Sequence, residues 1–126
     1  MRVIPHYHGD AVRALFVLGA LILIVAESTG ATLPLSTAAT VVVAATLVIA
    51  AGITNPVQVW IHWVNACLAA AGSVLFGSTL IENYRNGTSV LDPSYVFLEA
   101  LALLSLIALY FTTRTIRGLM LRPENE

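Results

Sequence analysis

The sequence has no lysine, a single cysteine and few charged residues of either sign. Only 10% of its 126 residues are charged, whereas 58% are hydrophobic. A soluble domain carries roughly 25% charged residues because its surface faces water, and a chain this short has a large surface for its volume. So few charges cannot cover that surface. The composition therefore excludes a water-soluble globular domain and predicts an integral membrane protein.

Other absences exclude several function classes. The single cysteine, Cys67, excludes an intrachain disulfide, and a formal net charge of −1 without lysine argues against a nucleic-acid partner. The sequence also lacks a His-Glu-x-x-His motif, a glycine-rich phosphate loop and a nucleophile–base pair. We therefore expect neither enzyme activity nor a cofactor.

Four apolar segments are long enough to be membrane helices, which need about 20 residues to cross a hydrocarbon core of roughly 30 Å. They cover about 11–32, 36–54, 56–83 and 93–118. The basic start of the first segment and the small residues near Ser28 also permit a cleaved signal peptide, but we expect the segment to be retained. The sequence predicts an all-α, polytopic protein with a single domain, an up-down bundle of four transmembrane helices.

Residues that favour helix N-termini precede each segment. Asp10 and Ser36 can cap the first and second helices. Asn55-Pro56 and Asp92-Pro93 each offer a capping side chain followed by proline, which is harmless at the first helical position because its missing N–H needs no partner there.

The arginines predict the orientation in the membrane. Only Arg85 lies in a connection between predicted helices; the other five flank the bundle near the two chain termini, namely Arg2, Arg13, Arg114, Arg117 and Arg122. Positive residues favour the cytoplasmic side of a membrane. We therefore expect both termini in the cytoplasm and the protein in the cell membrane, with the lipid bilayer as its immediate partner.

Polar and small residues recur along the third segment at alternating steps of four and three, which places them on one helical face. This polar stripe comprises Gln58, His62, Asn65, Ala69, Gly72, Phe76, Thr79 and Asn83. Lipid cannot satisfy its polar groups, so it must face protein or water. It is a packing seam, or it lines a water-filled path between copies with Phe76 as a constriction, or it borders a ligand or lipid pocket. Beside it, Ala69, Ser73 and Gly77 form a row of small residues that permits close helix packing.

Acidic residues gather toward the predicted outer surface. Glu27 and Glu99 lie at similar depth on the first and fourth helices, and Glu82 ends the third. If the carboxyls are close, repulsion and desolvation favour sharing a proton or binding a cation. Alternatively they reach the headgroups, pair with Arg85, or make a structural bond to another carboxyl or to a hydroxyl.

A metal site is one interpretation of His6, His8 and Asp10 near the first helix, with His62 as a further ligand. The alternative is a membrane-edge segment followed by a helix cap.

These patterns leave three functional hypotheses. The first is a homo-oligomeric channel or carrier for protons or small cations, with the third helix lining the path. The second is a non-transporting accessory or scaffold protein whose polar stripe is an assembly interface. The third is a metal sensor. Both of the first two imply self-association or membership of a larger membrane complex.

Overall fold

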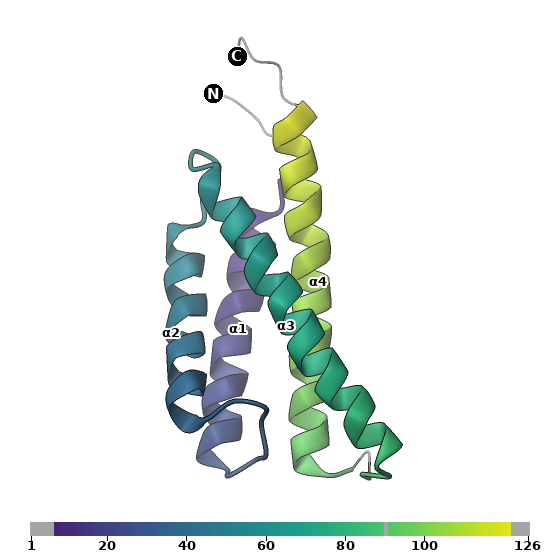
Figure 1. The fold of residues 1–126 in the computed structure, drawn as a ribbon. Coiled ribbons are helices and arrows are strands. Elements are labelled where there is room, and N and C mark those ends of the chain that lie inside the picture. The colour runs from purple at the N-terminus through teal and green to yellow at the C-terminus, as the bar shows by residue number, and fades with distance from the viewer. Residues whose placement is uncertain (1–6, 90, 122–126) are drawn as a thin grey trace.

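A computed structural model describes residues 7–89 and 91–121 of the chain. All regular secondary structure in these residues is helical, which confirms the predicted all-α class. The helices are α1 (Gly9–Ser28), α2 (Thr37–Ile53), α3 (Trp60–Arg85) and α4 (Pro93–Leu121). They alternate in direction, so α1 begins and α4 ends at the same end of the bundle (Figure 1). The end where α1 begins and α4 ends is called the terminal end, and the other end of the bundle is called the opposite end.

Three of the helices, α1, α3 and α4, are long and apolar enough to cross a membrane. Helix α2 is apolar but has 17 residues, about 26 Å of helix, slightly less than a hydrocarbon core. Large hydrophobic side chains are exposed on every helix, for example Leu21, Val42, Val74 and Leu103. In water such a surface would be strongly unfavourable. The fold is therefore that of a small membrane-embedded protein.

Two of the predicted helix starts are confirmed, because local hydrogen bonds define them. The Ser36 hydroxyl accepts a hydrogen bond from the Ala39 N–H over 3.1 Å, so Ser36 caps α2. Helix α4 begins at Pro93, and Oδ1 of Asp92 accepts the Ser94 N–H over 2.9 Å. Both serve donors that would otherwise lack a partner inside the helix.

The other two predicted caps are wrong. Helix α1 begins at Gly9, so Asp10 lies within its first turn and pairs with Arg13 at 3.9 Å instead of capping the helix. Helix α3 begins at Trp60 and not at residue 56. Oδ1 of Asn55 accepts the backbone N–H groups of Val57 and Gln58 over 2.8 and 2.9 Å, which holds the intervening residues in a turn.

The predicted helix ends shift as well. Helix α1 ends at Ser28, four residues before the predicted end, because Gly30 adopts a φ of +79° that a helix cannot continue through. Gly87 has a φ of +76° just after α3, whose last residue is Arg85 and not Asn83. Glycine is the residue that adopts this conformation at little cost, so it stops a helix. Helix α4 extends three residues past the predicted 118.

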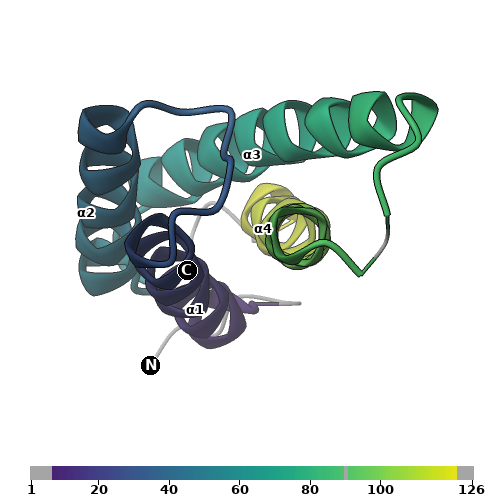
Figure 2. The same cartoon turned by 90° about the horizontal axis from the view of Figure 1, so that it is seen from below.

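The four helices do not pack equally. Helix α4 lies between α1 and α3 (Figure 2), and α1 also packs along α2. By contrast, α2 and α3 meet mainly near their short connection and diverge toward the opposite end (Figure 1). Apolar side chains from all four helices form the core, in one cluster around Phe16, Ile61 and Ala108 and another around Leu23, Phe76 and Leu98.

Candidate functional site

Buried polar side chains concentrate toward the terminal end of the bundle. Six polar side chains are buried in the described part of the chain, and five of them come from residues near this end of α2, α3 and α4. These five form what we call the polar cluster: Thr54, His62, Asn65, Thr112 and Thr115, each at most 1% exposed. The sixth, Thr40, lies near the start of α2.

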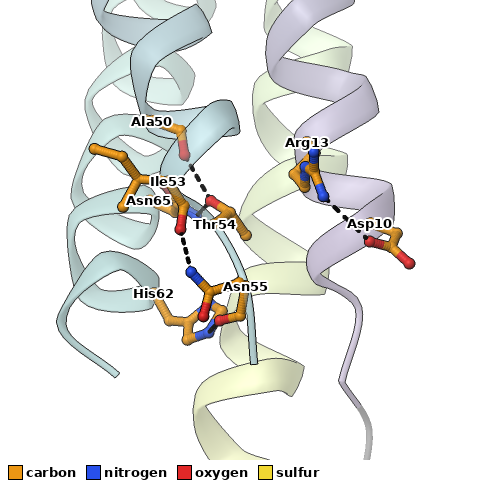
Figure 3. Close-up of polar contacts among 8 residues, drawn as sticks. All are labelled: Asp10, Arg13, Ala50, Ile53, Thr54, Asn55, His62 and Asn65. Atoms are coloured by element: carbon orange, nitrogen blue, oxygen red, sulfur yellow. Dashed lines mark hydrogen bonds and ion pairs between the residues drawn. The ribbon is translucent and has the colours of Figure 1, made fainter. Parts of the chain in front are cut away.

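Asn65 and Thr54 join α3 to the end of α2. Nδ2 of Asn65 donates to Oγ1 of Thr54 over 2.8 Å, and that hydroxyl donates to the Ala50 carbonyl over 2.7 Å (Figure 3). Oδ1 of Asn65 is buried and has no hydrogen-bond partner among the described residues. A buried acceptor without a partner costs about 1–3 kcal/mol. Asn65 and Thr54 therefore tie α3 to the end of α2 and leave one buried acceptor unpaired among the described residues.

His62 holds the connection between the same two helices. Its Nε2 lies 3.0 Å from the backbone oxygen of Asn55 (Figure 3). Because a carbonyl oxygen only accepts, Nε2 carries the hydrogen in this bond. The Asn55 side chain in turn donates to the Ile53 carbonyl over 2.7 Å. His62 is thus engaged in a structural contact.

The residues before α1 cover the polar cluster. The Tyr7 ring meets the His62 ring edge-on, with centroids 5.6 Å apart, and the His8 N–H donates to Oγ1 of Thr115 over 2.8 Å. The His8 ring packs on Phe111 at 5.0 Å. Burial, with the nearby negative charge of Asp10, raises the pKa of the Tyr7 hydroxyl. Tyr7 and His8 therefore connect the segment before α1 to His62 of α3 and to Thr115 of α4.

The residues predicted as metal ligands are engaged in other contacts where they are described. His6 lies outside the described residues. His8 stacks on Phe111, Asp10 pairs with Arg13, and His62 bonds to Asn55. Within residues 7–89 and 91–121, no three His, Cys, Asp or Glu side chains are grouped as metal binding requires.

Most residues of the polar stripe face the interior of their own chain. His62, Asn65, Ala69 and Phe76 are buried, and Gly72, Thr79 and Asn83 are half-buried. Ala69 packs in the cluster around Phe16, and Phe76 packs in the cluster around Leu98. Gln58 precedes the helix and is exposed. The stripe thus contacts other helices of one chain.

The three acidic residues lie toward the opposite end, in different environments. Glu27 is half-buried, and its Oε1 accepts a hydrogen bond from Oγ1 of Thr37. This is the carboxyl–hydroxyl bond that was one of the alternatives. Glu82 and Glu99 are exposed on α3 and α4.

Within the predicted row of small residues, Ala69 is buried in the core, but the closest approach at a glycine of α3 occurs beside the row, at Gly72. Around Gly77, no described atom apart from its chain neighbours and the backbone of its own helix lies within 4 Å of the place a Cβ would take. At Gly72, by contrast, a Cβ would lie 2.6 Å from Oγ of Ser105 on α4. The sequence analysis missed Ser105. Its signal was the lone hydroxyl in an otherwise apolar stretch of residues 100–109.

An apolar cavity of about 160 Å³ lies in the middle of the bundle. All four helices line it, with residues such as Phe16, Leu23, Leu47, Gly72, Phe76 and Ser105. Ser105 is the one polar side chain among the described lining residues. At the level of this cavity, between the polar cluster and the opposite end, the interior of the bundle is therefore almost entirely apolar.

Comparison with known proteins adds no relative. No family model, curated protein or solved structure matches the chain.

Proposed function

We propose that this chain is a non-transporting, non-enzymatic accessory or scaffold protein of the cell membrane. It acts through its lipid-facing helix surfaces, on copies of itself or on another membrane protein. One observation carries the proposal: His62, Asn65, Ala69 and Phe76 of the polar stripe are buried within their own chain, which favours a packing seam over a path between copies.

The middle of the bundle supports the same conclusion. Ala69, Gly72 and Phe76 border the apolar cavity, with Leu23 and Leu101 opposite them. An ion crossing this region would lose its hydration without gaining polar ligands, which is strongly unfavourable. An apolar interior therefore disfavours an ion path through one chain. The lipid-facing surface of the helices is the part that can contact a partner.

The competing proposal is a homo-oligomeric channel or carrier for protons or small cations. The unused Oδ1 of Asn65 favours it, because a buried oxygen without a partner is a potential ligand for a cation or a water molecule. The acidic residues Glu27, Glu82 and Glu99 would then attract cations at the opposite end.

Flux measurements in proteoliposomes separate the two proposals. We expect proton and cation flux equal to that of protein-free vesicles for the wild type, for a Glu27→Gln, Glu99→Gln double variant and for Phe76→Ala. Wild-type flux that falls in the double variant, or a leak that rises with Phe76→Ala in folded protein, would overturn the accessory proposal and favour the channel.

Cross-linking tests assembly through the outer surface. Cys67 is exposed on α3 and is the only cysteine of the sequence. If α3 joins two copies, oxidation in native membranes yields a disulfide-linked dimer that the Cys67→Ser control lacks. If oxidation and mass measurement in native membranes both show only monomer, the partner is a different protein.

A further inference from the structure

The accessory proposal assigns no ligand to the cavity in the middle of the bundle. It measures about 160 Å³ and is lined almost entirely by apolar side chains. In water-soluble proteins, an apolar cavity of about 150 Å³ stays dry and takes up small apolar molecules. The expected occupant is therefore hydrocarbon and not water.

The cavity lies at the depth of the acyl chains. Gly72 is near the middle of α3, about 18 Å along the axis from Trp60. Phe16 and Leu47 are likewise in the central turns of α1 and α2, and Ser105 is in the central part of α4. In a bilayer, this level is occupied by acyl chains.

The cavity opens sideways. The pairs α1–α2, α1–α4 and α3–α4 pack along one another and close three sides, whereas α2 and α3 diverge (Figure 1). Ala71 of α3 lines the cavity although it is exposed, and Leu47 of α2, also a lining residue, is only half-buried. Leu35, in the connection between α1 and α2, lines the cavity as well. The open side therefore faces the bilayer interior.

We propose that this cavity binds the end of a lipid acyl chain that enters between α2 and α3. The lining chemistry fits an unsubstituted hydrocarbon, because Ser105 is its one polar side chain among the described residues and lies against Gly72. The site stands independently of the accessory role, since a transporter could hold a lipid in the same place.

The test uses two leucines that are equally buried. Leu23 and Leu98 are both 0% exposed, but only Leu23 borders the cavity. Wild-type protein with protonated leucine methyl groups and otherwise deuterated is placed in phosphatidylcholine nanodiscs. We expect nuclear Overhauser contacts from acyl-chain protons to Leu23 and to the exposed Leu103, but none to Leu98. Leu47→Phe, which places a larger side chain at the entrance between α2 and α3, should weaken the Leu23 contact and keep that of Leu103.

Three results would overturn the proposal. The first is no Leu23 contact while Leu103 shows one. The second is equal contacts at Leu23 and Leu98, which would indicate general loosening of the bundle. The third is a Leu23 contact that persists in nanodiscs of chain-deuterated lipid, which would identify the occupant as another small apolar molecule or a second copy of the chain.

Discussion

Gly72 of α3 faces Ser105 of α4 so closely that a Cβ on the glycine would lie 2.6 Å from the serine Oγ and 3.3 Å from its Cβ. This contact lies in the middle of the most extensively packed helix pair of the bundle. Small residues allow membrane helices to approach, and van der Waals contacts then hold them together. The glycine therefore sets the separation of α3 and α4 beside the cavity.

Enlarging Gly72 should separate these helices. We expect Gly72→Leu to destabilise the fold by about 1–3 kcal/mol, the usual cost of overpacking. Gly77→Leu on the same helix is the matched control and should be nearly neutral, because no described atom beyond its chain neighbours and the backbone of its own helix lies within 4 Å of its Cβ position. Unfolding in detergent–SDS mixtures measures both. Equal losses of unfolding free energy in the two variants would contradict the Gly72–Ser105 contact. Adding Ser105→Gly to Gly72→Leu should restore part of the lost stability, because it removes the side chain that the leucine meets.

Asn65 should contribute little net stability although it is fully buried. Asn65→Leu removes one hydrogen bond, worth about 0.6 kcal/mol on average in a membrane protein, but also removes the unpaired Oδ1. We expect a change below about 1 kcal/mol. Asn65→Asp, of similar shape, should be much more destabilising at neutral pH than Asn65→Leu, because burying an ionised carboxylate, or protonating it at that pH, costs free energy. A large loss for Asn65→Leu in the same unfolding assay would indicate a partner for Oδ1.

Ser36 should stabilise α2 through its cap. Ser36→Ala removes the acceptor for the Ala39 N–H and should cost about 1 kcal/mol. Ser28→Ala is the control, because the Ser28 hydroxyl only donates to the Val25 carbonyl of its own helix. Thermal unfolding followed by circular dichroism compares the two variants. Equal unfolding temperatures of the two variants would show that the Ser36 cap does not contribute measurably to stability.

The arginines predict the orientation. Arg13, Arg114 and Arg117 lie at the terminal end and Arg85 lies at the opposite end, so the terminal end should face the cytoplasm. In a Cys67→Ser background, an impermeant maleimide should label Ser89→Cys in intact cells and Met120→Cys only after permeabilisation. The reverse pattern would place the termini outside.

Local chemistry made part of the fold predictable. The apolar runs indicated four helices in a membrane, and Ser36 and Asp92-Pro93 marked helix starts that the structure confirms. Asn55 and Asp10 carried the same signals, yet neither caps its helix: Asn55 holds a turn, and Asp10 follows a start at Gly9. A side chain of this kind can cap a helix, hold a turn or form an ion pair. Contacts elsewhere in the chain select one of these arrangements.

From the sequence alone follow the membrane setting, the all-α class, the four helices of the described residues and, apart from Gln58, the residues that share the stripe face of α3. Helical periodicity assigns residues to a common face but does not say what that face contacts. The packing of the helices determines that most of the stripe faces its own bundle, that Asn65 meets Thr54, and that Gly72 meets Ser105 beside the cavity. The physical reason is that lipid and a neighbouring helix are equally apolar, so hydropathy cannot distinguish them, whereas side-chain shape and hydrogen bonding can.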